Sequence, residues 1–119
     1  TAPSVIGQIR AGTVRALALT GDERSRALPD IPTLKEKGLA SFDSGSWFGL
    51  FAPKGTPDTV IEAINGAVNE AFRDPALQAK LIGNGADPMG GTPERFATFV
   101  KSEIDKWRAV IQETGVQAE

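Results

Sequence analysis

The chain has 119 residues, of which 40% are apolar and 24% are charged, and its formal net charge is −2. This balance is typical of one packed domain, and the lack of a long basic run argues against duplex nucleic acid as a partner. Histidine, cysteine and tyrosine are absent, which excludes disulfides, cysteine nucleophiles, histidine general bases and zinc sites built on histidine or cysteine. No apolar run approaches the roughly 18 residues of a membrane-spanning helix.

The first twenty residues predict a helix followed by a strand. Pro3 suits the first turn of a helix, apolar residues recur on one side of the next two turns, and Gly12 is a natural stop. Residues 13–20 read T-V-R-A-L-A-L-T, in which a polar start gives way to an apolar run. This pattern favours a strand that is buried at its far end.

The next segment predicts a polar loop, a short helix and a second strand. The loop covers residues 21–30, and the short helix runs from Pro32 to Lys37 and stops at Gly38. A polar connector at residues 40–45 leads to an aromatic-rich strand at residues 46–52.

Three later helices share a start signal in which a capping residue precedes proline. The sequence reads T-P-D at residues 56–58, D-P at residues 74–75 and T-P-E at residues 92–94. Apolar residues follow at helical spacing after each start. We expect the second of these helices to end near residue 82 and the last to end at Gly115, with Trp107 in the core.

The balance of elements predicts an α/β fold with few strands and flanking helices. Two clear strands stand among about five helical segments, with a weaker third candidate at residues 86–89. Both clear strands are apolar enough to be covered on both faces, and a sheet needs more members to be stable. The sequence therefore indicates part of a larger α/β protein.

Several motifs in a fixed order resemble one protein family. They are I-R-A-G-T-V-R-A-L-A-L-T, R-S-R-A-L-P-D-I-P-T-L-K-E-K-G-L, W-F-G-L-F-A-P-K-G-T-P, G-A-D-P-M-G-G-T-P-E-R-F and K-W-R-A-V-I. Together they resemble the C-terminal part of the solute-binding proteins of tripartite tricarboxylate transporters, often called Bug proteins. The resemblance covers residues 3–115, which correspond to about the last two-fifths of a family member.

The resemblance implies part of a fold like that of the type II periplasmic binding proteins, in which two lobes enclose the ligand. Residues 1–20 would end the second lobe, residues 21–45 would contain the crossover, and residues 46–119 would form the C-terminal part of the first lobe. It also implies a periplasmic protein that delivers a small carboxylate to membrane permease subunits. Di- or tricarboxylates, amino acids and aromatic acids are the expected ligand classes.

Five residues are candidates for contact with such a ligand. Helix N-termini present unpaired N–H groups that suit a carboxylate, and Ser4 adds a hydroxyl there. Thr20 and Ser46 stand at the ends of the predicted strands, and Trp47 and Phe48 point to opposite faces of a regular strand. Each has a plainer interpretation, in which Ser4 is a solvent-facing cap, the two aromatics are core, and the other two are loop or strand-end residues.

No catalytic residue, cofactor or metal site is predicted. The carboxylates fall on polar helix faces or in first turns, and none pairs with another in an apolar setting that would separate their pKa values. They are Asp58, Glu62, Glu70, Asp74, Glu94, Glu103 and Asp105. We expect Arg24 and Arg26 to face solvent, with Arg26 pairing with Asp30 or Glu36.

Two other function classes stay open beside the binding-protein hypothesis. One is a non-catalytic interaction or dimerisation module, in which a second copy joins through exposed strand edges. The other is an α/β enzyme that uses Asp or Lys chemistry, which would need a convergent acid–base pair.

Overall fold

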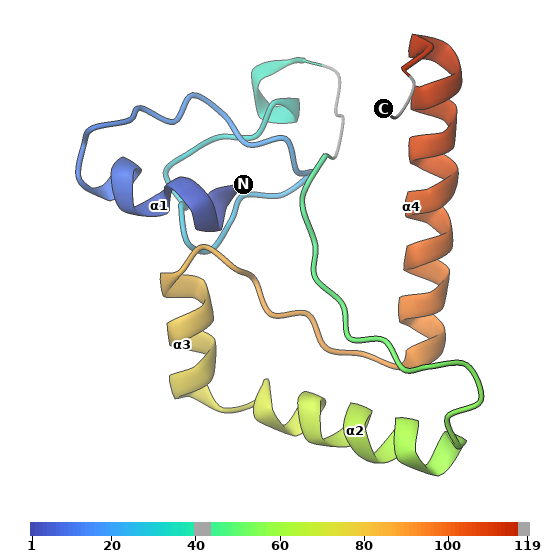
Figure 1. Ribbon diagram of the computed structural model, residues 1–119. Helices are drawn as coiled ribbons and strands as arrows, with labels where there is room; N and C mark the ends of the chain where they lie inside the picture. Colours follow the sequence, from blue (N-terminus) through green and yellow to red (C-terminus); the bar gives the residue numbers. More distant parts are fainter. Residues whose placement is uncertain (40–43, 117–119) are drawn as a thin grey trace.

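The computed structural model describes residues 1–39 and 44–116, and their regular structure is helical (Figure 1). The elements are α1 (Ala2–Arg10), the 3₁₀ turn η1 (Lys35–Lys37), α2 (Asp58–Ala71), α3 (Pro75–Gly83) and α4 (Pro93–Thr114). All of them lie in segments that the sequence predicts as helical. Most of the predicted connector at residues 40–45 lies outside the described residues.

Two of the helices, α3 and α4, begin with a side-chain cap. The Asp74 carboxylate accepts a hydrogen bond from the Ala76 N–H at 2.8 Å, and the Thr92 hydroxyl accepts one from the Arg95 N–H at 3.3 Å. By contrast, α2 is preceded by Pro57 and has no side-chain cap, although Thr56 was expected to cap it. The Thr56 hydroxyl donates instead to the carbonyl of Pro53 at 2.9 Å, and so closes the preceding turn.

The predicted strands do not form a sheet within the described residues. An isolated parallel bridge joins Leu19 to Thr33, through the Leu19 N–H to the Pro32 carbonyl at 2.9 Å and the Leu34 N–H to the Leu19 carbonyl at 2.8 Å. Residues 46–52 and the weak candidate at 86–89 form no ladder. A strand needs a neighbouring strand for its backbone hydrogen bonds, and the described residues supply none beyond this bridge.

The end of α3 lies against the start of α1. The Arg10 guanidinium donates to the carbonyl of Gly83 at 2.7 Å. Gly85 is buried with φ +80°, and a Cβ there would lie 3.0 Å from the Ala2 carbonyl carbon and the Pro3 nitrogen. Only glycine satisfies both this conformation and this close approach.

Both loop arginines form ion pairs, and the partner expected for Arg26 was wrong. Arg26 pairs with Asp87 at 2.9 Å, and not with Asp30 or Glu36. Glu36 pairs with Arg24 at 2.9 Å. The Arg26 pair crosses 61 residues of sequence, so it depends on how α3 packs and cannot be inferred from local spacing.

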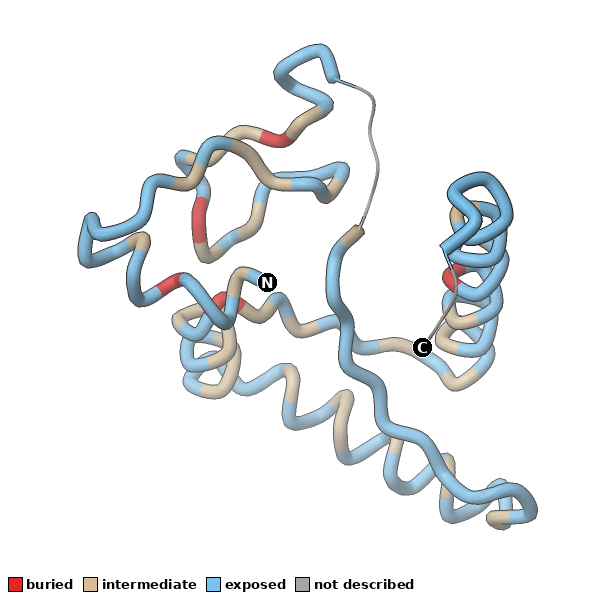
Figure 2. Tube along the Cα trace, turned by 45° about the horizontal axis from the view of Figure 1, so that its top comes forward, coloured by how far each residue is buried: buried red, intermediate tan, exposed pale blue. Residues whose placement is uncertain are grey.

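The described residues bury little apolar surface (Figure 2). Ile6 and Leu28 are the buried hydrophobic residues among them, and Trp107, which we expected in the core, is 40% exposed. The accessible surface is 9095 Å², whereas a compact protein of this mass exposes about 6200 Å². The radius of gyration is 17.0 Å, against about 13.5 Å for a compact domain of this length.

Candidate functional site

One face of the segment 46–52 packs on α4 through aromatic rings. The Trp47 ring lies 5.3 Å from that of Phe99 and edge-on to it, and the Phe51 ring lies 5.2 Å from that of Phe96. Trp47 contacts both Phe96 and Phe99, whereas Phe51 contacts the earlier ring, Phe96, and the segment runs opposite to the helix, as Figure 1 shows. These four rings, from Trp47, Phe51, Phe96 and Phe99, are called the aromatic cluster below.

Neighbouring residues at the start of the segment differ in whether they contact α4. A Cβ on Gly49 would lie 2.2 Å from Cζ of Phe96, so Gly49 shares the α4-facing side with Trp47. Phe48 is 88% exposed and Trp47 is 38% exposed, whereas Leu50 and Phe51 are similarly exposed at 69% and 64%. The expectation that Trp47 and Phe48 point to opposite faces is consistent with this difference.

A buried carboxylate anchors the aromatic cluster. Glu103 is 8% exposed, and its Oε2 accepts a hydrogen bond from Nε1 of Trp47 at 3.2 Å. Its other oxygen pairs with Lys106. The Lys106 ammonium, followed by the indole N–H groups of Trp47 and Trp107, holds the pKa of the Glu103 carboxyl below its ordinary value. The sequence-based placement of Glu103 on a polar helix face is therefore wrong.

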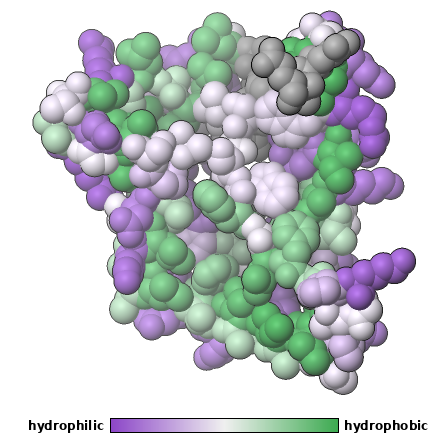
Figure 3. Space-filling model, in the orientation of Figure 1, coloured by the Kyte–Doolittle hydropathy of each residue, from purple (hydrophilic) through white to green (hydrophobic). Residues whose placement is uncertain are grey.

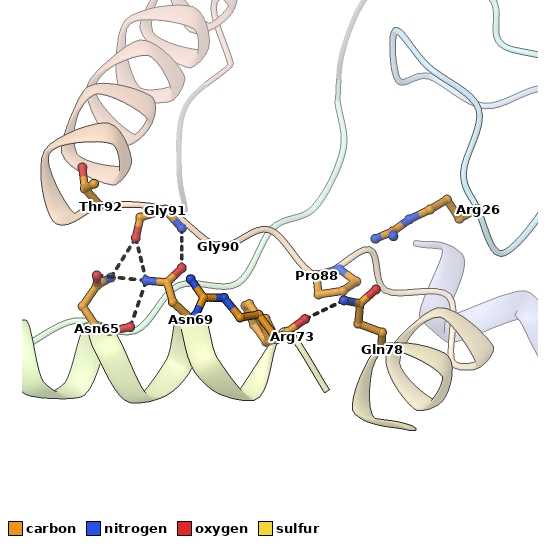
Figure 4. A pocket seen from close by; sticks show the side chains of 10 residues that line it. Arg26, Asn65, Asn69, Arg73, Gln78, Pro88, Gly90, Gly91 and Thr92 are labelled. Carbon is orange, nitrogen blue, oxygen red and sulfur yellow. Dashed lines mark hydrogen bonds between the residues drawn. The ribbon is translucent and has the colours of Figure 1, made fainter. Parts of the chain in front are cut away.

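An open groove of about 530 Å³ lies between α2, α3 and the stretch that leads into α4 (Figure 4). On its floor the Asn69 side chain donates to the Gly91 carbonyl at 2.9 Å and accepts from the Gly91 N–H at 2.8 Å. Asn65 donates to the same carbonyl at 3.0 Å. The two asparagines thus hold the backbone at Gly91 against α2.

The charges beside this groove are already compensated. Arg73 pairs with Glu70 at 2.8 Å, and Arg26 pairs with Asp87 at 2.9 Å. The amide groups on its floor are occupied by Gly91. The groove is therefore best explained as a place where α2 and the α3–α4 connection are joined.

The hydroxyl of Ser4 is engaged at the start of α1. It donates to the Thr1 carbonyl at 2.7 Å. Ser4 is thus the third residue of α1, and Thr1 is the N-cap.

The other sequence-predicted site residues are exposed, and the structure does not gather them. Thr20, Ser46 and Phe48 are exposed, and Trp47 is 38% exposed. Within the described ranges, no hydrogen bond or ring contact joins any two of the five candidates. Trp47 and Phe48 are together only because they are adjacent in sequence.

Sequence reasoning missed three residues that organise these contacts. Asn65 and Asn69 lie four residues apart on α2, a spacing that places both on one helix face. Glu103 falls at helical spacing with Phe96 and Trp107 on α4. These spacings are the signals that could have located them.

Residues 1–39 and 44–116 contain no cluster of three or more Asp or Glu side chains arranged to hold a metal ion. Over the same ranges, no helix is both long and apolar enough to cross a membrane.

Comparison with a solved structure identifies the fold class of the chain. A solved structure described as "Structure of a periplasmic transporter" has a TM-score of 0.84 and 36% sequence identity, and it matches 97% of this chain and 38% of its own. This confirms the predicted fold class, part of an α/β fold of the periplasmic-binding-protein kind with few strands and flanking helices.

The family follows from the sequence match. Residues 1–116 match the model of the tripartite tricarboxylate transporter family receptor, so the chain belongs to this receptor family. Protein BugT of Bordetella pertussis is 37% identical over 115 residues, which are 97% of this chain and 35% of BugT. The UPF0065 protein in the tcbD-tcbE intergenic region of Pseudomonas sp. is 40% identical over 111 residues, or 92% of this chain and 33% of that protein. The chain spans about a third of these relatives.

Proposed function

We propose that the chain is the C-terminal part of an extracytoplasmic solute-binding protein that captures a small carboxylate for a tripartite tricarboxylate-type transporter. The match of residues 1–116 to the receptor family carries this proposal. Because the chain spans 35% of BugT, the ligand site is shared with polypeptide outside these residues. Residues 1–20 then belong to the second lobe, 21–45 to the crossover and 46–119 to the first lobe.

The proposed protein works in the periplasm and delivers its ligand to membrane permease subunits. The similarity to a structure described as a periplasmic transporter supports this location. Binding proceeds without turnover, which fits a receptor family. The ligand is a di- or tricarboxylate, an amino acid or an aromatic acid.

Thr20 and Ser46 are the ligand contacts that we carry forward from the five candidates. Both are exposed, and neither hydroxyl has a hydrogen-bond partner among the described residues. The Ser4 hydroxyl and the Trp47 indole N–H are engaged by Thr1 and Glu103. A hydroxyl that donates to a carboxylate contributes a charge-assisted hydrogen bond.

Calorimetry on the full-length receptor and on this 119-residue chain tests the proposal. The panel contains citrate, succinate, glutamate and benzoate. We expect the full-length receptor to bind one of these classes and the isolated chain to bind none. In the full-length receptor, Thr20→Val and Ser46→Ala should each weaken binding roughly tenfold, as loss of a hydrogen bond to a charged group does.

Ser102→Ala is the matched control, because Ser102 is exposed on α4 and its hydroxyl donates to the carbonyl of Phe99 in the same helix. It should leave affinity unchanged. Turnover of any panel compound, or equal binding by the isolated chain, would contradict the proposal.

A further inference from the structure

One buried carboxylate lies on the side of α4 that faces the segment 46–52. Figure 3 shows apolar side chains on the inner side of α4 and hydrophilic side chains along its outer edge. Glu103 is only 8% exposed, and its Oε2 accepts the hydrogen bond from Nε1 of Trp47 at 3.2 Å. Lys106 pairs with the other oxygen. The carboxylate is thus directed at a single polar group of the segment, the indole N–H.

Stability alone does not account for a charge at this position. Burying a carboxylate costs free energy that its partners do little more than offset, so an apolar residue of similar size would join the two elements equally well. The aromatic cluster already supplies apolar contacts, with the Trp47 ring 5.8 Å from that of Phe96 and 5.3 Å from that of Phe99. A hydrogen bond adds direction, because it weakens steeply when misaligned, whereas apolar burial is non-directional. Glu103 therefore fixes the orientation of Trp47 as well as its place.

Ser46 lies next to this fixed side chain and has few contacts of its own. It is exposed, and its hydroxyl has no hydrogen-bond partner among the described residues. Within the same residues, none of the N–H or C=O groups of 46–52 makes a backbone hydrogen bond. The contacts of Trp47 with α4 are therefore a fixed point one residue away from the Ser46 hydroxyl.

We propose that Glu103 is a positioning residue for ligand binding, which orients Trp47 and thereby holds the Ser46 hydroxyl where the ligand carboxylate meets it. This inference rests on the proposed function, in which Ser46 is a ligand contact. Binding groups must be held within about 0.5 Å of their productive geometry, so a displaced Ser46 loses its contact although Glu103 does not touch the ligand. Thr20, the other proposed contact, follows the bridge from Leu19 to Thr33 and does not depend on Glu103.

A double-mutant cycle in the full-length receptor separates positioning from a general effect on folding. Calorimetric titrations use citrate, succinate, glutamate and benzoate. Glu103→Leu removes the acceptor of the indole, and the Lys106 side chain, which is 26% exposed, still reaches water. Glu103→Leu should weaken binding roughly tenfold, as Ser46→Ala does. The double variant should bind no more weakly than either single variant, because the displaced hydroxyl has already lost its contact. Additive losses would overturn the proposal.

Three further variants control this cycle. Glu103→Gln keeps an oxygen acceptor for the Trp47 indole and should restore most of the affinity that Glu103→Leu loses. Thr20→Val combined with Glu103→Leu should give additive losses, since the two act on separate contacts. Asp105→Asn removes the exposed partner of Arg108 at the same spacing on α4 and should leave affinity unchanged. A loss in Asp105→Asn or Glu103→Gln as large as that in Glu103→Leu would overturn the proposal.

A measurement without ligand tests the anchor itself, and it uses a variant that keeps the aromatic ring. Trp47→Phe retains the ring contacts with α4 and loses only the indole donor. The NMR order parameter of the Ser46 amide in the ligand-free, full-length receptor should fall from about 0.85 toward about 0.6, the value of a flexible backbone. It should stay near the higher value in Asp105→Asn. An unchanged order parameter in Trp47→Phe would overturn the proposal, even if Glu103→Leu fails to fold.

The outcomes keep the positioning role apart from the proposed function. If a compound of the panel binds and Ser46→Ala leaves its affinity unchanged, the positioning role fails and carboxylate capture stands. If Ser46→Ala weakens binding but the cycle is additive, only the role of Glu103 fails. If no compound binds the full-length receptor, the proposed function fails, and a lower order parameter in Trp47→Phe would still show that the anchor holds Ser46.

Discussion

The indole N–H of Trp47 donates to the carboxylate of Glu103 at 3.2 Å across 56 residues of sequence. Glu103 is 8% exposed, so its charge is largely removed from water and needs compensation. The ion pair with Lys106 compensates part of this buried charge, and the hydrogen bond from the indole compensates another part. The segment 46–52 is therefore held on α4 by a directional hydrogen bond as well as by the ring contacts.

Replacing Trp47 with Phe should destabilise the full-length receptor by about 1–3 kcal/mol, because a buried carboxylate loses one of its donors. Urea denaturation followed by circular dichroism measures this change. Lys101→Ala, at an exposed site on α4, is the control and should stay within about 0.5 kcal/mol of the parent. A Trp47→Phe variant as stable as that control would show that the indole hydrogen bond does not contribute to the free energy of unfolding.

The stability contributed by the Glu103 charge should depend on pH in one direction. The pKa of Glu103 is lowered in the folded protein from its ordinary value of 4.5, so the unfolded chain takes up a proton first as the pH falls. The contribution is therefore fully present above pH 4.5 and is lost as the pH falls through the lower folded pKa.

Glu103→Gln isolates this effect, because the amide oxygen can still accept from Trp47 while the charge beside Lys106 is gone. We expect the difference in unfolding free energy between parent and variant to be largest near neutral pH and to shrink below pH 4.5. Denaturation series between neutral and acidic pH would show it. A difference that grows toward acid would contradict the assignment.

Gly49→Ala should destabilise the receptor, because the added Cβ would lie 2.2 Å from Cζ of Phe96. Overpacking of this kind costs about 1–3 kcal/mol. Gly66→Ala on α2 is the matched control, since a Cβ there meets nothing within 4 Å, and it should be neutral or stabilising by up to about 1 kcal/mol. Combining Gly49→Ala with Phe96→Leu should recover part of the loss; a purely additive double variant would argue against a direct clash.

The two asparagines that hold Gly91 should contribute unequally. Asn69 makes two hydrogen bonds to the Gly91 backbone, and Asn65 makes one. We expect Asn69→Ala to cost about 1–3 kcal/mol and Asn65→Ala to cost less. Exchange of the Gly91 amide should accelerate in the Asn69 variant and stay slow in the Asn65 variant, and the reverse order would contradict the geometry.

Local sequence signals were sufficient to predict most of the helix boundaries. Asp74 and Thr92 cap α3 and α4 as their cap-then-proline pattern predicts, and α4 ends at Gly115 with φ +68°. These outcomes depend on neighbours within a few residues, so the sequence contains all the relevant information. Thr56 shows the limit of such rules, because its hydroxyl satisfies the Pro53 carbonyl instead of capping α2.

The family was also predictable, because several motifs in a fixed order identify it over nearly the whole chain.

The predicted strands do not form a sheet within the described residues, and the reason is physical. Strand propensity belongs to a segment, but a ladder needs a second segment at its edge. The bridge at Leu19 and Thr33 forms because these two segments of the chain lie side by side and exchange backbone hydrogen bonds.

By itself the sequence determined the helices, their stops and the receptor family. Only the tertiary structure decided that Asp87 is the partner of Arg26, that Glu103 is buried, and that Trp47 and not Phe48 faces α4. Each of these depends on contact between segments that are about 50 to 60 residues apart in the sequence. Local propensity acts over a few residues, whereas burial and ion pairing are set by the packing of distant elements.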